Sequence, residues 1–578
     1  MTGIITRRVD KSEFSFLSFY LDRCRRILPA LFVTCLAVAV VGYYFVVPTD
    51  YESLGKHIYN SIIFSSNINY FQEVSYFDAD AKLKWLLHTW SLSVEWQFYI
   101  LYPLFIFFAN LFGGRKLVNL VVAAIFATSF FYSVYASIYD KSAAFYLIYS
   151  RGWEMAAGGL VYLFPYLLSN LAGARTKLVG LLIILLSIIL IDSSQTWPGA
   201  LAFIPVAGAC LFISSHRNNS TILDFSPFQF LGKVSYSVYL WHWPIVVFID
   251  YTMLGSLCVS VAGILGSIIL GYASFELIEK PSLILMKKIK NRRLKEVLIF
   301  SFLIAAPYAI GKSIYDNKGF PERFPFSLIT TEQLNAERAR YWVDGDKLHP
   351  VAKTGDRKVV IVGNSHGIDL TYALTTNGIK ADITYLRTTN HCSNFGLTPN
   401  GKEDESGCEG IIESVMNSED LRQADVVFLH DDWARESISD TKKIVSEIMG
   451  KTNGEVYVIG PKMKFTASPS IIISKAMSDK ITSISGVNNY AKNYYIESKI
   501  ELNEDLKSLF KEMKSPKLHF IDALKLQCGD KLDCDILSED DKSFVYFDTG
   551  HFTLKGANIF GSKLKKYYPD IFIETRSK

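Results

Sequence analysis

The sequence has no strong excess of charge, no cleavable leader at its start and no cysteine spacing typical of a zinc site. A net charge of +4 over 578 residues is too small to predict nucleic-acid binding. The basic stretch from Arg7 to Arg26 runs into an apolar segment without a cleavage pattern, so we expect that segment to be retained. The cysteine spacings match no common zinc pattern, and we expect no metal.

Long apolar runs are abundant instead, and nearly all lie in the first ~310 residues. A helix needs about 20 apolar residues to cross a bilayer. The runs predict a polytopic α-helical membrane domain of about nine spans. The polar, helix-like stretch 51–72 is expected outside the membrane or at its interface. The nine runs are 27–47, 86–110, 117–136, 142–168, 178–192, 198–214, 233–252, 254–278 and 296–312.

Lysine and arginine alternate between the loops that join these runs. Basic residues precede the first span and recur in every second loop, whereas the intervening loops carry only Lys56, Lys82, Lys84 and Lys141. Because cytoplasmic loops are enriched in Lys and Arg, the chain is expected to begin in the cytoplasm. An odd number of crossings then places everything after residue 312 outside.

Several predicted spans contain polar residues that hydrocarbon tolerates only when they have partners. The spacing of seven between His88 and Glu95, and of three between Arg151 and Glu154, puts each pair on one helical face. Together these side chains predict a polar cavity or substrate path; the alternative is a set of buried salt bridges that only fix helix packing. The candidates are His88, Glu95, Arg151, Glu154, Tyr239 and His242.

The second half alternates strand-like and helix-like segments after a polar connector that ends near residue 355. A Val/Ile run precedes Gly363 and is typical of a buried parallel strand. The alternation predicts an α/β domain with a parallel sheet. Further strands are expected at 425–430, 455–460 and 518–522, and helices at 410–424, 440–451 and 499–513.

Ser365 follows the first of these strands within Gly363–Gly367, and Asp548 and His551 stand near the end of the domain. A serine on a strand-to-helix turn is exposed at the carboxyl edge of the sheet. A neutral histidine can take its proton, and an aspartate can hold that histidine in the right tautomer. We therefore predict a Ser365–His551–Asp548 triad; the alternative is that His551 caps a helix and Asp548 lies in a turn.

Five segments of the apolar half together resemble the acyltransferase-3 family of membrane acyltransferases. The resemblance implies that acetyl-CoA, or another acyl-CoA, is used from the cytoplasmic side, and that a carbohydrate hydroxyl on the opposite face receives the acyl group. Arg23 and Arg26 match the family's arginine pair, whose guanidinium groups suit CoA phosphates; the alternative is plain positive-inside anchoring. The five segments are Phe19–Pro29, His88–Tyr99, Arg151–Glu154, Ser235–Pro244 and Glu276–Pro281.

The resemblance implies two further membrane segments ahead of this start, the first with a histidine thought to be catalytic. Met1–Ile5 matches the last turn of the second such segment. The matching histidine is therefore absent, and we assign its role to no residue here. We expect either a shortened chain or the loss of the first half-reaction.

The tight Asp-x-x-His spacing and the compact length of the second half resemble the SGNH (GDSL-like) hydrolases. The serine motif also fits the elbow of α/β-hydrolases, in which acid and histidine lie on separate loops. Asn364 stands where the SGNH family usually has Asp, and Asn394 and Gly396 are candidate oxyanion-hole donors. The expected domains are 1–285 (acyltransferase), 286–354 (linking helix and connector) and 355–578 (SGNH).

Four of the eight cysteines lie in the soluble half. In an oxidising compartment the natural local pairs are Cys392 with Cys408 and Cys528 with Cys534. Three connectivities are possible for four cysteines.

The joined resemblances imply a two-stage O-acyltransferase in a bacterial inner membrane, with the C-terminal domain in the periplasm. Ser365 is expected to accept an acetyl group delivered by the membrane half and to pass it to a sugar hydroxyl. Lipopolysaccharide O-antigen is the first expectation for the acceptor. Peptidoglycan is the second, and a membrane-anchored esterase is the third interpretation. The expected partners are the bilayer, an acyl-CoA donor and a glycan acceptor, with no nucleic acid.

Overall fold

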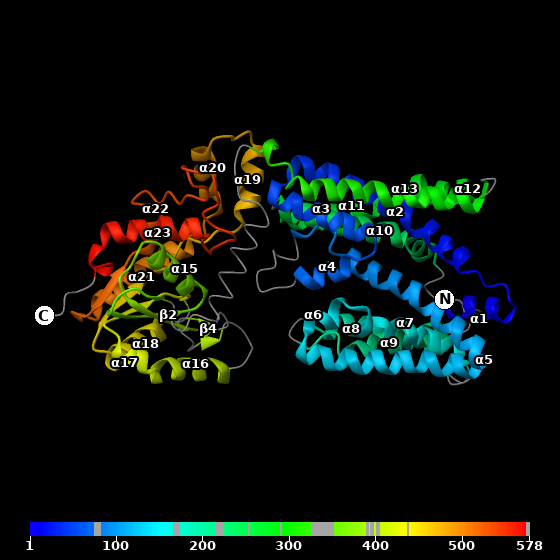
Figure 1. Ribbon diagram of the computed structural model, residues 1–578, viewed down its shortest axis with the longest axis horizontal. Coiled ribbons are helices and arrows are strands. Elements are labelled where there is room, and N and C mark those ends of the chain that lie inside the picture. Colours follow the sequence, from blue (N-terminus) through cyan, green and yellow to red (C-terminus); the bar gives the residue numbers. More distant parts are fainter. Residues whose placement is uncertain are drawn as a thin grey trace. The chain divides into compact units, whose positions relative to one another are not determined.

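The computed structural model describes residues 1–73, 83–165, 174–192, 195–214, 225–252, 255–288, 292–324, 352–388, 392–393, 398–399, 405–435 and 438–573. These residues form two compact units (Figure 1). The helical unit contains Met1–Tyr44 and Tyr51–Asn317, and the α/β unit contains Phe45–Asp50 and Lys318–Lys578.

The helical unit is built from long apolar helices joined by short segments. Its elements are α1 (Thr2–Asp10), α2 (Phe16–Phe45), α3 (Pro48–Ile62), α4 (Ser66–Glu73), α5 (Thr89–Tyr139), α6 (Lys141–Tyr146), α7 (Ile148–Leu163), α8 (Ala174–Leu190), η4 (Ala200–Ala202), α9 (Phe203–Ser214), α10 (Ser226–Tyr251), α11 (Leu257–Ser274), the π-helical η6 (Phe275–Glu279), α12 (Lys280–Lys288) and α13 (Arg292–Asp316).

Within the described ranges, four helices are long and apolar enough to cross a membrane: Phe16–Phe45, Thr89–Tyr139, Leu257–Met286 and Arg293–Asp316. The predicted runs 86–110 and 117–136 are joined in α5, where the backbone bends at Gly114 with φ 58° and ψ −154°. These angles are non-helical, so α5 consists of two helices that meet in a kink at Gly114, where glycine reaches positive φ without strain. The count of nine crossings stays a prediction.

Large apolar side chains cover much of the outside of this unit. Phe112, Ile189 and Leu257 are 78%, 76% and 82% exposed. A water-soluble protein rarely leaves so many large apolar groups uncovered, whereas lipid tails cover them at no cost. The exposure therefore agrees with membrane helices.

The stretch 51–72, expected outside or at the interface, is helical and packs against α5. Its polar side chains contact polar side chains of α5 that recur at every fourth residue and therefore lie on one face of that helix. The hydroxyl pairs are Ser61 with Thr89 at 2.8 Å and Ser66 with Ser93 at 2.7 Å, and Gln97 donates to Asn67 at 2.8 Å. Ser61, Ser66 and Asn67 are buried. The polar character of the stretch thus reflects helix–helix hydrogen bonds.

The larger segment of the α/β unit follows α13. Its elements are η7 (Pro321–Arg323), β1 (Ala352–Lys353), β2 (Lys358–Gly363), α15 (Ser365–Thr376), β3 (Asp382–Arg387), β4 (Cys392–Ser393), β5 (Thr398–Pro399), α16 (Glu405–Asn417), α17 (Glu419–Gln423), β6 (Val426–Leu429), α18 (Ile438–Lys451), β7 (Glu455–Ile459), α19 (Pro469–Ser478), α20 (Ile484–Tyr490), η10 (Ala491–Tyr494), α21 (Ser498–Glu512), β8 (Leu518–Ile521), α22 (Ala523–Cys528), α23 (Leu554–Tyr567) and η11 (Pro569–Ile571).

The main sheet has the strand order β1-β3-β2-β6-β7-β8. The strands from β3 to β8 are parallel, but β1 pairs antiparallel with β3. The predicted parallel sheet is therefore mixed, because a two-residue strand closes one edge. A small second sheet pairs β4 with β5.

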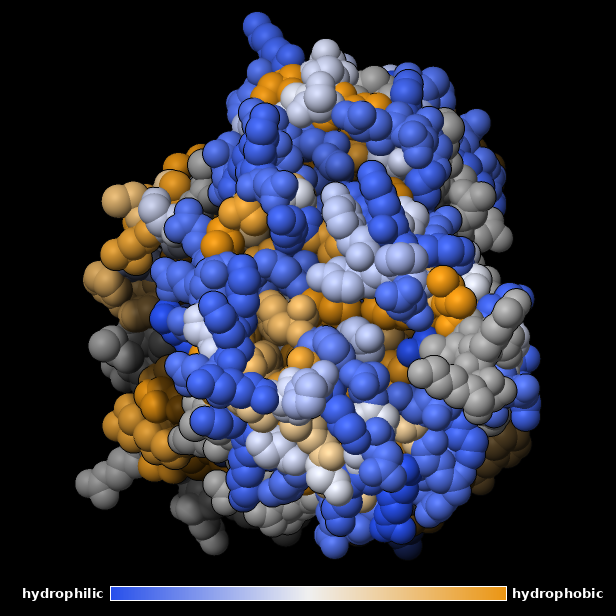
Figure 2. Space-filling model, turned by 90° about the vertical axis from the view of Figure 1, so that its left-hand side faces the viewer, coloured by the Kyte–Doolittle hydropathy of each residue, from blue (hydrophilic) through white to orange (hydrophobic). Residues whose placement is uncertain are grey.

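The core of this unit lies between the central strands and the helices on one face. Val360, Val427 and Val456 pack there with apolar side chains of α18 and α21, such as Ile444 and Leu506. Helices α15 and α23 pack against each other. In the view that turns this unit toward the reader, the face is mainly hydrophilic (Figure 2). Covered strands with a polar exterior are typical of a water-facing α/β domain.

Candidate active site

Ser365 lies where β2 ends and α15 begins. In the sheet, β2 has a neighbouring strand on each side. Asn364 caps α15, because its side-chain oxygen accepts a hydrogen bond from the His366 N–H at 3.0 Å. The serine is therefore presented at the carboxyl edge of the parallel strands, which is where α/β domains place their sites.

Two contacts hold the turn before Ser365 in one conformation. A Cβ on Gly363 would lie 1.9 Å from the carbonyl oxygen of His430, so only glycine fits between these strand ends. The Tyr385 hydroxyl lies 2.9 Å from the carbonyl oxygen of Gly363 and 2.6 Å from that of Asn364. The neighbouring strands β6 and β3 thus determine where the serine stands.

Asp548 and His551 share one tight turn. Oδ1 of Asp548 accepts hydrogen bonds from the N–H groups of Gly550 at 2.8 Å and His551 at 2.7 Å. Its other oxygen, Oδ2, lies 2.7 Å from His551 Nδ1. The carboxylate therefore orients the imidazole with its proton on Nδ1, which leaves Nε2 as the basic nitrogen.

That nitrogen lies 2.8 Å from Ser365 Oγ, so the serine hydroxyl can donate to it. The Phe547 ring stacks on the imidazole at a centroid distance of 5.7 Å. Burial by itself would raise the pKa of Asp548, but His551 and the two amide donors outweigh it and hold the pKa well below its usual range. The predicted serine, histidine and aspartate are thus brought together in the geometry of a hydrolase triad.

The structure adds two buried histidines beside the triad that the sequence analysis did not select. The His366 ring lies 5.5 Å from the rings of both His551 and His430. Burial lowers the pKa of His366 well below its ordinary value and that of His430 to about 4, so both are neutral near pH 7. His430 ends the strand predicted at 425–430, so its position in the sequence could have identified it as a residue at the carboxyl edge of the sheet.

A charged cluster at the same edge of the sheet was also missed. Asp432 accepts from Lys464 Nζ at 2.7 Å and from Lys499 Nζ at 2.8 Å. Partial burial would raise the pKa of Asp432, but the two ammonium groups lower it to about 2. Asp432 follows β6 and Lys464 follows β7, so adjacent parallel strands deliver them to one edge, a relationship that no local motif reveals.

The oxyanion-hole candidates Asn394 and Gly396 lie outside the residues that the structure describes.

In the helical unit, His88 lies with Tyr239 and His242. The His88 ring is 5.1 Å from the Tyr239 ring and 5.6 Å from the His242 ring. The Tyr239 hydroxyl donates to the His88 carbonyl oxygen and lies 2.7 Å from Ser91 Oγ. Helices α5 and α10 therefore bring three of the predicted residues together.

The other predicted residues of this unit have local partners. Arg151 donates to Glu154 at 2.5 Å, and its guanidinium lies 5.3 Å from the Trp90 ring. Glu95 accepts from the Tyr99 hydroxyl, one turn further along α5. Arg151 and Glu154, which share one helical face, thus form an ion pair. The partner of Glu95 is Tyr99 on the same helix.

The two predicted CoA-binding arginines differ in their surroundings. Arg23 is half-buried, and its guanidinium lies 5.4 Å from the Phe19 ring and 5.3 Å from the Tyr99 ring. Its Nε has no hydrogen-bond partner within the described part of the chain. Arg26 is exposed. Arg25, which lies between them, donates to buried Glu296 at 2.9 and 2.6 Å. Arg25 is thus engaged within the protein, whereas the buried Nε of Arg23 is not paired within the described part of the chain.

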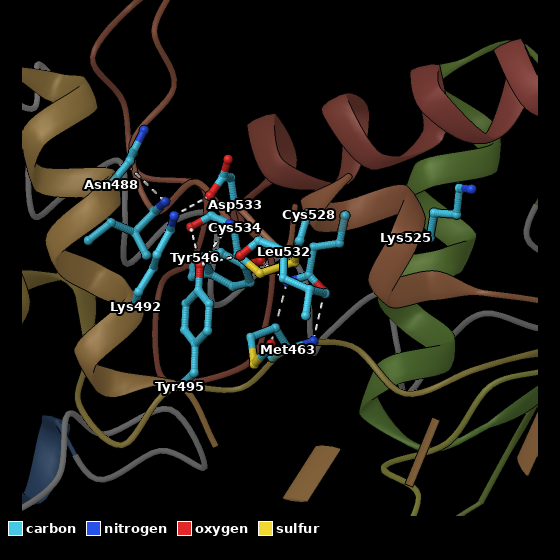
Figure 3. Close-up of a disulfide and its surroundings, with 12 residues drawn as sticks. Met463, Asn488, Lys492, Tyr495, Lys525, Cys528, Leu532, Asp533, Cys534 and Tyr546 are labelled. Atoms are coloured by element: carbon cyan, nitrogen blue, oxygen red, sulfur yellow. Dashed lines mark hydrogen bonds and ion pairs between the residues drawn. A yellow bond between two sulfur atoms is a disulfide. The ribbon is translucent and has the colours of Figure 1, made fainter. Parts of the chain in front are cut away.

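The structure joins Cys528 to Cys534 in a disulfide, one of the expected local pairs (Figure 3). The Tyr495 hydroxyl accepts from the Cys534 N–H at 2.7 Å and donates to the Leu532 carbonyl oxygen at 3.2 Å (Figure 3). The expected Cys392–Cys408 pair lies outside the described side chains. Among the residues that the structure describes, no cluster of histidine, cysteine, aspartate and glutamate is suited to a metal.

Two family profiles match the chain in succession. The profile described as "Acyltransferase domain" matches residues 5–276, and the profile described as "SGNH domain (fused to AT3 domains)" matches residues 333–566. A Haemophilus influenzae protein described as uncharacterized is 30% identical over 211 residues, which are 36% of this chain and 86% of that protein.

Named relatives match the chain over part of its length. The putative membrane-bound transacylase BcsY of Komagataeibacter xylinus is 29% identical over 47% of this chain and 70% of its own length. The peptidoglycan O-acetyltransferase OatA of Listeria monocytogenes is 26% identical over 43% of this chain, which spans only 42% of that protein. Among solved structures, the periplasmic domain of a Salmonella ser. Paratyphi A lipopolysaccharide acetyltransferase matches with 19% identity and a TM-score of 0.31, over 40% of this chain and 95% of that domain.

Proposed function

The chain belongs to the membrane acyltransferases in which an acyltransferase domain is fused to an SGNH domain, and we propose that it is an O-acetyltransferase that modifies a hydroxyl of a cell-surface glycan. The observation that supports this most directly is the hydrogen-bonded chain from Asp548 through His551 to Ser365. The triad supplies a nucleophile, and the fused membrane domain is of the acyltransferase family.

The geometry suits a two-step transfer. His551 Nε2 takes the proton of Ser365 Oγ as that oxygen attacks the acetyl carbonyl. The C–O bond of the serine ester forms, the bond to the donor's leaving group breaks, and His551 returns the proton to that group. A glycan hydroxyl then attacks the serine ester, and His551 carries its proton to Ser365 as the serine leaves. Asp548 stabilises the imidazolium in both steps.

We propose acetyl-CoA as the donor, taken up on the cytoplasmic side. Arg23 and Arg26 offer guanidinium groups for its phosphates, and the unpartnered Nε of Arg23 among the described residues supports this assignment. The cluster of His88, Tyr239 and His242 lies on two of the packed helices and supports a polar path in the membrane half.

We further propose that the SGNH domain, expected at 355–578, lies in the periplasm of a Gram-negative cell, with the membrane half in the inner membrane. The alternation of basic loops supports this placement. The Cys528–Cys534 disulfide supports it independently, since disulfides persist in oxidising compartments.

Lipopolysaccharide O-antigen is the acceptor that we propose. Peptidoglycan is the second candidate, because two relatives, from Listeria monocytogenes and Bacillus subtilis, are named for the O-acetylation of peptidoglycan. Expression of the full chain in cells that make both polymers separates the two. Mass spectrometry of each polymer should show acetyl esters on O-antigen repeats, which disappear with Ser365→Ala. Acetyl esters found only on muropeptides would instead identify peptidoglycan as the acceptor.

A membrane-anchored esterase is the remaining alternative. If the triad only hydrolyses esters, the full chain will lower the acetyl content of the glycan, and Ser365→Ala will restore it. If the triad transfers acetyl groups, the same substitution will lower the acetyl content. The sign of the change therefore decides between hydrolysis and transfer.

A further inference from the structure

A buried ion pair between Asp369 and Lys462 lies beside the triad. The two side chains are 1% and 0% exposed. Asp369 stands four residues after Ser365 in α15, so both lie on one face of that helix. Lys462 belongs to the loop after β7, which ends at Ile459. The pair thus joins the helix of the nucleophile to a different strand of the sheet.

Asp369 also contacts the turn that holds the general base. Its Oδ2 pairs with Lys462, and its Oδ1 accepts from the Phe552 N–H at 3.2 Å. Phe552 directly follows His551. The Lys462 ammonium lies 4.4 Å from the centroid of the Phe552 ring. Phe552 is therefore held twice. The Asp369 carboxylate accepts a hydrogen bond from its backbone N–H, and the Lys462 ammonium contacts its ring.

The loop that contains Lys462 has two more contacts with the same region. The Phe465 N–H donates to the carbonyl oxygen of Thr549 at 2.8 Å, inside the turn from Asp548 to His551. The Met463 N–H donates to Gln527 Oε1 at 2.7 Å. Lys462 is thus part of a loop that is fixed to the acid–base turn through Phe465 and to α22 through Met463.

We propose that the Asp369–Lys462 pair positions the triad: it fixes Phe552, and through Phe552 it holds the His551 ring at hydrogen-bond distance from Ser365 Oγ. Stability alone does not explain such a pair, because buried ion pairs replaced by apolar residues of similar volume often leave stability unchanged or raise it. Asp369 is a positioning residue and takes no part in bond making. The inference rests on the proposed function of the triad.

The test separates positioning from stability with two double variants. Asp369→Leu with Lys462→Met removes both charges and leaves the Phe552 N–H without its acceptor. Asp369→Asn with Lys462→Met also removes both charges but keeps a side-chain oxygen for that N–H. The second variant buries an unpaired amide NH₂ and should be the less stable of the two. If the pair positions the triad, the order of the two variants in stability is therefore opposite to their order in activity. The Leu/Met variant is the more stable, and the Asn/Met variant is the more active.

The full chain in detergent micelles is assayed with 4-nitrophenyl acetate, and melting temperatures are measured on the same samples. We expect the Leu/Met variant to lose at least tenfold in kcat with KM unchanged, and the Asn/Met variant to stay within about threefold of the wild type. Activities that follow the melting temperatures, or a Leu/Met variant with wild-type kcat, would overturn the proposal.

Two controls complete the test. Arg435→Gln removes ion pairs to Glu501 at 2.6 Å and to Asp505 at 3.1 Å on the surface of the same unit, and kcat should not change. Ser365→Ala should abolish hydrolysis; unchanged hydrolysis would overturn the proposed function, and this inference with it. If the Leu/Met variant does not fold, Asp369→Glu keeps the charge but displaces the acceptor. We expect it to lower kcat at least fivefold, and wild-type kcat in that variant would overturn the proposal.

Discussion

Ser365 Oγ and His551 Nε2 lie 2.8 Å apart although 186 positions separate the two residues in the chain. The strand β2 delivers the serine, and the turn before α23 delivers the histidine. The fold of the α/β unit thus brings two segments that are far apart in the sequence to hydrogen-bond distance.

Removal of the triad groups should abolish the chemistry and leave the fold intact. We expect Ser365→Ala and His551→Ala each to lower the hydrolysis of 4-nitrophenyl acetate by about 10³-fold or more, because the three groups act as a unit. Asp548→Asn should cost about 10²–10⁴-fold, since an amide cannot enforce the tautomer that the carboxylate does. Circular dichroism of each variant should match the wild type; retained hydrolysis in Ser365→Ala would exclude this serine as the nucleophile.

Gly363→Ala should be severely destabilising. The added Cβ would lie 1.9 Å from the backbone oxygen of His430, and backbone cannot move aside cheaply. We expect a loss of about 3 kcal/mol or more in the free energy of unfolding, or no folded α/β unit. Gly450 near the end of α18 is the matched control, because no atom lies within 4 Å of its added Cβ. Gly450→Ala should gain about 0.5–1 kcal/mol from helix propensity, and equal effects of the two substitutions in denaturant unfolding would contradict the packing argument.

Loss of the Cys528–Cys534 disulfide should destabilise the α/β unit modestly. The bond spans six positions, and closing so short a loop removes about 2 kcal/mol of chain entropy from the unfolded state. We expect Cys528→Ser with Cys534→Ser to lower the melting temperature of the oxidised protein, and an unchanged melting temperature would contradict a contribution of this bond to stability. A further drop when the double variant is treated with reductant would show that a second bond contributes.

The stability of the α/β unit should depend on pH through Asp432. Burial by itself would raise the pKa of Asp432, but Lys464 and Lys499 lower it to about 2 in the folded state. A group with a depressed folded pKa stabilises the fold above its unfolded pKa and loses that contribution as the pH falls through the folded value. The contribution, on the order of 1 kcal/mol after solvent screening of a partly exposed group, should therefore vanish between about pH 4 and pH 2.

Asp432→Asn should flatten the dependence in that window. Unfolding by denaturant at pH 6 and at successively lower pH measures the difference between the variant and the wild type. A difference that stays constant down to pH 2 would contradict the assignment of the ion pairs.

Much of the fold could be predicted from local patterns. The strands after Lys358, at 425–430, at 455–460 and at 518–522 are present, because each is short and rich in apolar residues. β3 was missed because it begins and ends with the charged residues Asp382 and Arg387 and has Thr384 between its apolar residues, so it contains no continuous apolar run. The mixed character of the sheet was also missed, since a two-residue edge strand such as β1 leaves no pattern.

The sequence by itself was enough to predict which residues form the triad. Its residue types, the strand before Ser365 and the three-residue spacing of Asp548 and His551 are all local, and local spacing is enough to place two side chains on one turn. The apolar runs likewise determined the helical unit, because a long apolar stretch has only one way to satisfy its backbone in lipid.

Only the tertiary structure decided which distant groups lie beside the predicted triad. The Asp369–Lys462 pair, the Asp432 cluster and the buried His366 and His430 come from separate strand and helix ends. Their meeting depends on the order of strands in the sheet, and strand order is a property of long-range pairing that no local spacing encodes. The polar stretch 51–72 shows the same limit, because its hydrogen-bond partners on α5 became visible only when the helices were packed.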